Sequence, residues 1–342
     1  MNSNLTIEVK HLQVGYNGKS TSDFNYPEIN VTALNNELIA LVGRNGVGKS
    51  TLLRTIARLQ KSIAGNILIN GKEVEKTDRN KLATLLSFIP AEPVHSPNTT
   101  VYDFVSLARY PYHSWFDALN TSDKFVIERA LKAVEMVSYK NRQIDRLSDG
   151  ERQRAMIAFA IAQDTPIILM DEPTAFLDLP NKFEVVRLLK EQSENGKTVI
   201  LSTHDIQTAF GFVDTIWLML PDGLRVGAPE DMVLTDAINR LMKDTSVKFD
   251  LNTGQFDYNI PKQKSVIISG EDKSIINWTA HALARLGYQT VKKVKNENTL
   301  SVEILNNEGK VQWCLNEVQR KPTFDSIRNL CIYLKMDYKN LE

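Results

Sequence analysis

Apolar residues occur along this chain in two patterns that predict strands. Three runs are almost continuously apolar, as expected of buried parallel strands, and they span 38–42, 167–172 and 197–203. Elsewhere apolar and polar residues alternate or flank a turn, which predicts antiparallel strands. These segments are 5–14, 28–34, a hairpin at 65–74 around Asn70-Gly71, and a closing hairpin of 213–220 and 224–226. The pattern therefore predicts a small antiparallel sheet beside a parallel one.

A third pattern, in which apolar residues are three and four positions apart, predicts helices. These helices span 51–59, 101–109, 122–139, 148–163 and 182–191, the last with Asn195-Gly196 as its stop. The prolines of 87–100 predict a loop or hinge, and the helices after it form a helical insertion at about 90–160. We expect one α/β domain over residues 1–245.

Residues 262–342 predict a separate, small α+β domain. Strand-like segments at 264–269 and 299–305 alternate with helical segments at 274–286, which ends at Gly287, and 324–334. This part carries no chemical motif, and its two tryptophans, Trp278 and Trp313, are expected in its core. A regulatory or dimer-contact role rests on its position alone.

Composition narrows the function mainly by exclusion. The 342 residues include 41 basic and 41 acidic side chains, so net charge gives no reason to expect a nucleic-acid partner. Cys314 and Cys331 have no metal-ligand spacing and form no disulfide framework, which fits a reducing compartment. The N-terminus lacks a signal pattern, and nowhere do eighteen apolar residues follow one another. We expect a chain that is neither exported by a standard signal nor membrane-spanning.

Residues 43–50 carry the phosphate-loop pattern G-x-x-x-x-G-K-[ST] between a predicted strand and a predicted helix. Glycines let the loop curl so that backbone N–H groups face a phosphate chain. Lys49 can reach the β- and γ-phosphates, and the Ser50 hydroxyl can ligate Mg²⁺. The expected nucleotide-binding residues here are Gly43, Arg44, Asn45, Gly46, Gly48, Lys49, Ser50 and Thr51. The alternative is a glycine-rich turn that binds nothing.

Two acids and a histidine follow other predicted buried strands. Asp171 and Glu172 end the run 167–172, and His204 follows 197–203. Ligands of parallel sheets bind at the carboxyl ends of the strands, where Lys49 also lies. We expect Asp171 to hold Mg²⁺ through water, and Glu172 and His204 to orient the attacking water. A surface acid pair and a structural histidine remain the alternatives.

Two further positions complete the predicted nucleotide site. Tyr16 offers a planar face on which a purine ring could stack, although packing beside a turn is the simpler explanation. Ser148 fits an N-cap with Glu151 three residues on, as in a capping box. Ser148 and Gly150 are also expected to form a second anion-binding site at a helix start, called the signature seat below.

Together, residues 5–240 resemble the ATP-binding cassette ATPases, the motor subunits of ABC transporters. The matching segments are GRNGVGKS as Walker A, LSDGERQ as signature, IILMDE as Walker B, residues 175–178 as D-loop and His204 as switch histidine. The resemblance implies a P-loop ABC cassette that hydrolyses ATP with Mg²⁺. It also implies a homodimer, in which the signature seat of one subunit closes on the ATP held by Lys49 of the other, with Asp178 at the interface.

The chain departs from the family pattern at two places. Asp149 replaces the usual glycine of the signature, which suggests altered tuning rather than loss. Ala91 stands near the position of the usual glutamine that links the site to the membrane partner. The neighbouring Glu92 is a candidate for part of that coupling role, and a variant linker is the alternative.

Residues 100–115 are similar to a segment of the ATPases that serve iron-siderophore, haem and cobalamin importers. In that resemblance Arg109-Tyr110-Pro111 lies on the surface facing the permease. It implies uptake of an iron chelate, haem or cobalamin through a separate permease, indirectly with a substrate-binding protein, at the cytoplasmic face of the inner membrane. A soluble cassette of DNA repair or translation, and a non-enzymatic nucleotide sensor, are the competing interpretations.

Overall fold

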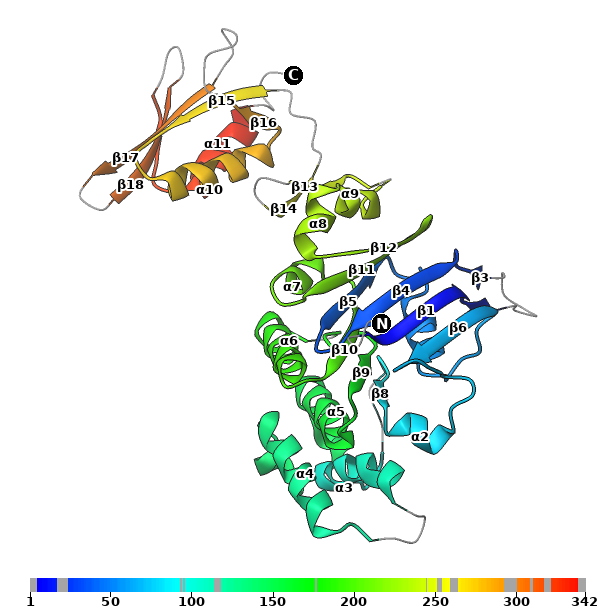
Figure 1. The fold of residues 1–342 in the computed structure, drawn as a ribbon. Coiled ribbons are helices and arrows are strands. Elements are labelled where there is room, and N and C mark those ends of the chain that lie inside the picture. The colour runs from blue at the N-terminus through cyan, green and yellow to red at the C-terminus, as the bar shows by residue number, and fades with distance from the viewer. Residues whose placement is uncertain are drawn as a thin grey trace. The chain divides into compact units, whose positions relative to one another are not determined.

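The computed structural model describes residues 5–16, 24–92, 94, 96–113, 118–175, 177–243, 245–250, 254–258, 264–291, 300–307, 310–316 and 321–337. The chain divides into two units, 1–243 and 244–342, and each is described by itself (Figure 1). Within these described ranges, no helix has both the length and the apolar character that a bilayer crossing requires.

A six-stranded sheet forms the centre of the first unit. Its strands, in spatial order, are β12 (Gly223–Gly227), β11 (Thr215–Leu220), β5 (Leu38–Gly43), β10 (Thr198–Thr203), β9 (Ile167–Met170) and β8 (Leu86–Ile89). Neighbouring strands from β11 to β8 are parallel, and only β12 runs antiparallel to its neighbour. The carboxyl ends of β5, β9 and β10 therefore meet at one edge of the sheet, where the predicted chemical groups follow.

Strand β8 corrects one prediction. Residues 87–100 were expected to form a loop, but Leu86–Ile89 pairs in parallel with β9 and is mostly buried. The strand is four residues long and Pro90 follows it directly, so its sequence offers no period from which a strand could be recognised.

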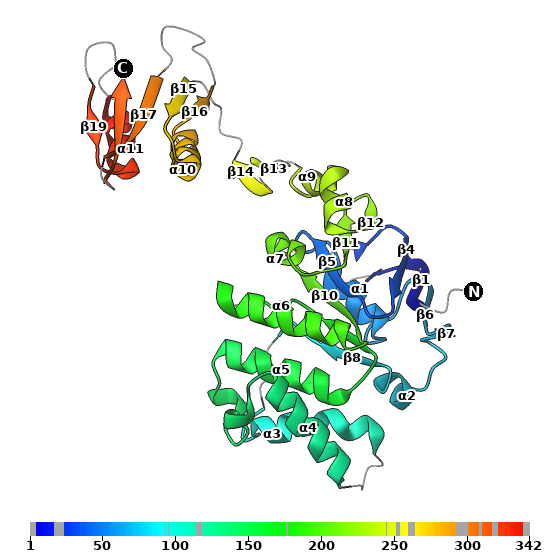
Figure 2. The same ribbon diagram turned by 60° about the vertical axis from the view of Figure 1, so that its left-hand side comes forward.

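A second, antiparallel sheet packs against the first through helix α1. The sheet has the order β4-β1-β6-β7, formed by Ile29–Leu34, Leu5–Gln13, Ala64–Ile69 and Lys72–Glu73. The predicted hairpin turn is present, with positive φ at Asn70 (48°) and Gly71 (74°) as a type I′ turn requires. Buried residues of both sheets join those of α1 (Lys49–Ile56) in one apolar cluster, which sandwiches the phosphate-loop helix between them (Figure 2).

The helical insertion lies between β8 and β9. It contains α3 (Val101–Ser106), the 3₁₀ segment η1 (Leu107–Tyr112), α4 (Thr121–Ala133), the 3₁₀ segments η2 (Val137–Tyr139) and η3 (Ile144–Arg146), and α5 (Asp149–Gln163). A short helix, α2 (Arg79–Ala83), precedes β8. Helix α4 is shorter than predicted, because the chain leaves helical geometry at Val134 and Glu135 has a φ of 58°. Helix α5 begins with the predicted capping box of Ser148 and Glu151.

The C-terminal end of α5 is held by three side chains. Arg109 donates to the Ala162 carbonyl at 2.9 Å, and the Tyr112 hydroxyl donates to the Gln163 carbonyl at 2.8 Å. The Gln163 side chain in turn donates to the Ala83 carbonyl at 2.8 Å, just ahead of β8. These bonds fasten this end of α5 both to η1 and to the sheet core.

Helices cover the other face of the central sheet. Helix α6 (Leu179–Glu194) is capped by Asp178 and extends beyond the predicted 182–191 at both ends. The remaining helices of the unit are α7 (Ile206–Phe210), α8 (Pro229–Leu234) and α9 (Ala237–Leu241). In both ribbon views α5 and α6 lie on the side of the sheet away from the antiparallel sheet (Figures 1 and 2).

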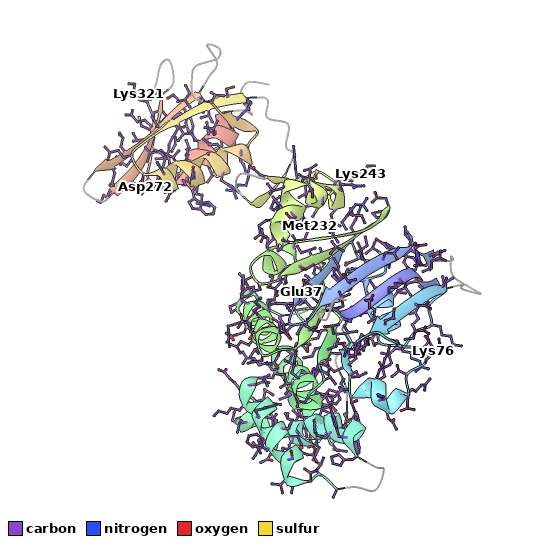
Figure 3. The ribbon with its side chains drawn as sticks, viewed as in Figure 1. Glu37, Lys76, Met232, Lys243, Asp272 and Lys321 are labelled. Carbon is purple, nitrogen blue, oxygen red and sulfur yellow. The ribbon has the colours of Figure 1, made fainter. Side chains whose placement is uncertain are left out.

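The second unit contains a short hairpin and an α+β layer. The hairpin pairs β13 (Val247–Asp250) with β14 (Gln255–Tyr258). A five-stranded sheet follows, ordered β16-β15-β17-β18-β19, with bounds Tyr288–Thr290, Lys264–Ser269, Leu300–Asn307, Lys310–Asn316 and Thr323–Phe324. Helices α10 (Lys273–Ala284) and α11 (Ile327–Asp337) share its apolar cluster, and Asp272 caps α10 (Figure 3).

The two tryptophans of this unit differ in burial. Trp313 is 8% exposed and donates its indole N–H to Thr279, so the prediction of a core residue is confirmed. Trp278 is 66% exposed, and the same prediction is wrong for it. It lies on α10 beside Thr279 but on the face that the sheet leaves open.

Candidate nucleotide site

The loop between β5 and α1 has a backbone that only glycine fits easily. Gly46 and Gly48 have φ of 79° and 110°, in the left-handed region. A Cβ atom on Gly48 would lie 2.7 Å from the Phe24 ring, and one on Gly43 would lie 2.8 Å from the Val47 side chain. Helix α1 starts at Lys49, so its N–H groups point into the concave side of this loop.

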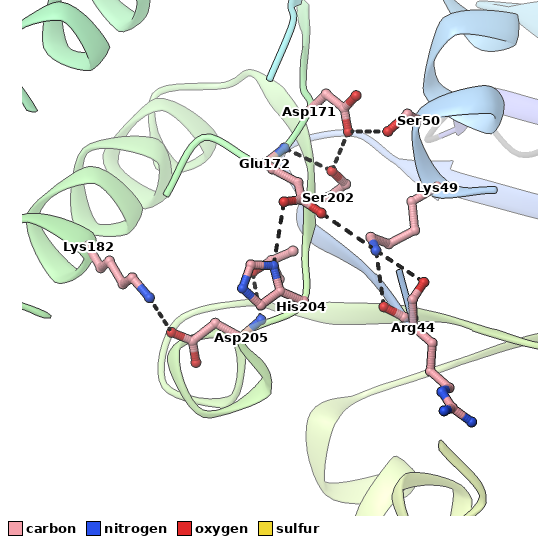
Figure 4. Close-up of polar contacts among 11 residues, drawn as sticks. Arg44, Lys49, Ser50, Asp171, Glu172, Lys182, Ser202, His204 and Asp205 are labelled. Atoms are coloured by element: carbon pink, nitrogen blue, oxygen red, sulfur yellow. Dashed lines mark hydrogen bonds and ion pairs between the residues drawn. The ribbon is translucent and has the colours of Figure 1, made fainter. Parts of the chain in front are cut away.

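Lys49 places one positive charge in the middle of this loop (Figure 4). Its side chain is 5% exposed, and Nζ donates to the carbonyls of Gly43 (3.0 Å) and Arg44 (3.4 Å). Nζ also lies 3.6 Å from Glu172 Oε1. The ammonium group is thus oriented toward the end of β9, as the shared sheet edge predicts.

Asp171 has two carboxylate oxygens in different situations. Oδ1 accepts hydrogen bonds from the Ser50 hydroxyl (3.0 Å) and the Ser202 hydroxyl (2.7 Å). Oδ2 is buried and has no hydrogen-bond partner among the residues that the structure describes. A buried, unpaired carboxylate oxygen next to a serine hydroxyl is a suitable donor set for a hard cation such as Mg²⁺.

Among the described residues, few groups besides Ser50 could join this carboxylate in binding a metal ion. In the described part of the chain, no three acidic, histidine or cysteine side chains gather as a metal-binding group. Mg²⁺ commonly takes one or two protein ligands together with water and substrate phosphates. Ser50 and Asp171 are therefore the protein groups that would hold the ion.

Glu172 and His204 face each other across the ends of β9 and β10. Glu172 has a φ of 48°, an uncommon conformation for a residue with a side chain, and such strain gathers at functional sites. Its Oε2 lies 3.5 Å from Nδ1 of His204, whose ring is about half exposed. The carboxylate is thereby placed between the lysine and the histidine, where it can accept a proton from water bound at the loop.

The signature segment forms the start of α5. The Ser148 hydroxyl accepts from the Glu151 N–H (3.3 Å), and the Glu151 carboxylate accepts from the Ser148 N–H (2.8 Å). This backbone hydrogen bond is the main reason why the pKa of Glu151 lies below its usual value. Asp149 lies 3.2 Å from the Arg152 guanidinium, so its extra negative charge is paired within the helix.

Tyr16 reaches the loop through an intermediate residue. It lies in β2 (Gly15–Tyr16), which pairs with β3 (Phe24–Asn25). The Tyr16 ring is 5.6 Å from the Phe24 ring, and Phe24 contacts the loop at Gly48. Tyr16 is half exposed, so part of its ring remains accessible.

The predicted coupling residues differ in their surroundings. Glu92 is exposed, and Asp178 caps α6 by accepting from the Asn181 N–H.

Arg109, expected on the permease-facing surface, is instead 8% exposed and pairs with Asp123 at 3.0 Å, which corrects that expectation. Burial raises the pKa of Asp123, but the hydrogen bonds from Arg109 and the Asn120 backbone outweigh it and lower the pKa overall. Its neighbour Tyr110 is the exposed residue, at 63%.

Known proteins with the same arrangement identify the family. The ABC transporter family matches residues 26–175, and the iron ABC transporter C-terminal domain matches residues 262–335. A probable siderophore transport system ATP-binding protein, YusV of Bacillus subtilis, is 35% identical over 237 residues, which cover 69% of this chain and 85% of that protein. This chain belongs to the ABC transporter ATP-binding proteins. The family assignment confirms the predicted cassette fold and shows that the chain is an ATPase.

Solved structures of ABC proteins agree with this fold. A metal-chelate type ABC transporter in an inward-facing conformation aligns with a TM-score of 0.62 at 25% identity, covering 74% of this chain and 96% of that one. The ATP-binding cassette MJ0796, dimeric and bound to ADP and Pi after hydrolysis, aligns with a TM-score of 0.58 at 27% identity, covering 65% of this chain and 98% of that one.

Two residues of this ABC site were not predicted from sequence. Phe24 supports the loop at Gly48, and it is an apolar residue at the end of a polar stretch. Ser202 bonds to both acids that follow β9, and it is a polar residue near the end of β10, a strand that is apolar over 199–201. The sequence feature that could have indicated Ser202 is a hydroxyl residue two positions before His204.

Asp171→Asn tests the metal assignment in this ATPase. The amide oxygen can still accept from Ser50 and Ser202, but the negative charge is lost, so Mg²⁺ should bind about tenfold more weakly or worse. The measurement is ATP affinity by calorimetry with Mg²⁺ and with EDTA. The affinity gain on adding Mg²⁺ should shrink in this variant.

Asp78→Asn is the matched control, because Asp78 caps α2 by accepting from the Asn80 and Lys81 N–H groups and, in the described part of the chain, forms no hydrogen bond with Ser50 or Lys49. It should keep the wild-type response to Mg²⁺. An unchanged response in Asp171→Asn would contradict the assignment.

Proposed function

We propose that this ABC ATPase powers uptake of a chelated metal or corrinoid (an iron chelate, haem or cobalamin) through a separate membrane permease. The observation that carries the iron part is the joint match of the cassette to a siderophore-transport relative and of residues 262–335 to an iron-transporter domain. The match of residues 262–335 to an iron-transporter domain favours this function over a soluble repair or translation cassette. We propose that residues 262–342 form an accessory domain of this subunit.

The chain's own groups account for the proposed hydrolysis. Backbone N–H groups of the loop and the start of α1 would hold the phosphates, with Lys49 reaching the γ-phosphate. Mg²⁺, held by Ser50 and Asp171, would supply charge that offsets the charge developing on the phosphates. Glu172 would orient the attacking water and accept its proton, and His204 would hold Glu172 from the other side.

The proposed assembly is a homodimer, peripheral at the cytoplasmic face of the inner membrane. Lys49 and the signature seat lie on different elements, the start of α1 and the start of α5. The seat carries a helix N-terminus and a hydroxyl, both suited to an anion, and is proposed to complete the site of a second copy. Membrane attachment would come from the permease subunits, with the substrate-binding protein reached only through them.

Glu172→Gln tests hydrolysis. The amide cannot accept a proton, so single-turnover hydrolysis should fall by about 100-fold or more while ATP binding is kept. Trapped in the ATP state, the variant should also elute as a dimer in size-exclusion chromatography with Mg²⁺ and ATP. Hydrolysis near the wild-type rate would favour a nucleotide sensor instead.

A mixture of two inactive variants tests the shared site. Lys49→Ala removes the phosphate contact, and Ser148→Arg blocks the seat. In a mixed dimer one site has both defects and the other has none, so an equal mixture should recover about a quarter of wild-type ATPase activity. Each variant alone is the control. Failure of the mixture to exceed either one would show that the seat does not act across a dimer.

A groove beside β8 is the proposed docking place of the permease. Its volume is about 440 Å³, and it is lined by Ala57, Arg58, Leu59, Arg79, Leu82, Ala83, Leu86 and Phe88. Leu59 is 64% exposed there, and β8 leads directly to Ala91 and Glu92. An apolar floor between two arginines fits an amphipathic permease segment that carries an acidic residue.

Leu59→Glu should prevent this docking, because a carboxylate would replace the apolar contact. The measurement is co-purification of the ATPase with its co-expressed permease, which should be lost while ATPase activity in solution stays within about twofold. Leu234→Glu, at an 80% exposed leucine of α8 outside the groove, is the control and should co-purify normally. Equal retention of both variants would place the permease elsewhere.

A further inference from the structure

The Ser202 hydroxyl lies between the two acids that follow β9 (Figure 4). Ser202 is fully buried near the carboxyl end of β10, two residues before His204. Its oxygen accepts a hydrogen bond from the Glu172 backbone N–H at 2.8 Å. Its hydrogen goes to Asp171 Oδ1 at 2.7 Å. One hydroxyl therefore contacts both acidic residues, one through its backbone and the other through its carboxylate.

The bond to Asp171 distinguishes the two oxygens of that carboxylate. A serine hydroxyl has one hydrogen to donate, and here it joins the Ser50 hydroxyl on Oδ1. With two hydroxyls on Oδ1, the carboxylate is held in one rotation and Oδ2 is directed to the buried position where it has no partner among the described residues. The Asp171 carboxylate is thereby fixed beside the Ser50 hydroxyl, the other protein group that would hold Mg²⁺.

The bond from Glu172 stabilises an uncommon backbone. At a φ of 48°, Glu172 turns its side chain away from the strand direction and toward Lys49 and His204. The N–H of such a residue cannot continue the parallel ladder, and the Ser202 oxygen accepts it instead. Position and direction of the Glu172 carboxylate therefore depend on this acceptor.

Another buried serine shows what an ordinary structural hydroxyl does in this sheet. Ser87 of β8 is 1% exposed, and its hydroxyl faces the Ile167 carbonyl of the adjacent strand at 3.5 Å. Ser202 has the same burial, but both of its bonds go to residues of the proposed catalytic machinery. A buried hydroxyl needs hydrogen-bond partners, but this need does not explain why both partners of Ser202 are the two acidic residues.

We propose that Ser202 is a positioning residue for ATP hydrolysis: it fixes the Asp171 carboxylate beside Ser50 and also fixes the backbone that directs the Glu172 carboxylate. The inference rests on the roles proposed above for those two acids. Its failure is distinguishable from theirs, because it concerns Ser202 variants in which both acids are intact.

The test compares Ser202→Ala, Ser202→Thr and Ser87→Ala in the full-length protein. Without the hydroxyl, kcat should fall by on the order of 10–100-fold, as when other groups that orient metal ligands are removed. The Mg²⁺ concentration for half-maximal activity should rise, while ATP affinity in EDTA stays within about twofold. Ser202→Thr, which keeps the hydroxyl, should regain most of kcat, and Ser87→Ala should behave as wild type in all three measurements.

Three results would overturn the proposal. They are wild-type kcat and Mg²⁺ dependence in Ser202→Ala, a loss that Ser202→Thr does not restore, and an equal loss in Ser87→Ala. If Ser202→Ala does not fold, Ser202→Cys replaces it, because the thiol is similar in shape and a weak hydrogen-bond donor. The same three criteria then apply to the cysteine variant.

Discussion

One buried ammonium group and two carboxylates share a single edge of the central sheet, and the rest of the cassette supports that arrangement. Lys49 is almost fully buried, and within the part of the chain that the structure describes its charge is stabilised by the loop carbonyls and by Glu172. Parallel strands bring these groups together because the ends of β5, β9 and β10 coincide. The antiparallel sheet and α5 and α6 cover the two faces, and Lys49 and Asp171 are buried between them, whereas the Glu172 side chain is a quarter exposed. Burial strengthens the interactions of the lysine and of Asp171.

Much of this arrangement was predictable because it depends on local sequence. The loop geometry follows from glycines at fixed spacing, the capping box from Ser148 and Glu151, and the sheet edge from acids that follow an apolar run. Contacts between distant segments were not predictable. Arg109 is buried because Asp123 and the Ala162 carbonyl, far along the chain, compensate its charge. Helical spacing likewise shows that α10 has two faces but not which one the sheet covers, so Trp278 was misplaced.

The departure in the signature segment is compensated locally. Asp149 adds a negative charge in the first turn of α5, where the helix dipole favours it, and it also pairs with Arg152. The capping box uses the residues on either side of it and is intact. The substitution therefore leaves the helix start formed while it lowers the positive potential that an approaching phosphate would meet.

Helix α5 is fastened at its C-terminal end, and the signature segment forms its N-terminal end. The C-terminal end is tied by Arg109, Tyr112 and Gln163, while Ser148 lies fifteen residues before Gln163. A helix of that length measures about 22 Å, so a tilt of about 10° around the fastened end would carry the far end through about 4 Å. In mechanical terms α5 is a lever: a small shift of η1 or β8 at its pivot becomes a displacement comparable to the size of a phosphate group.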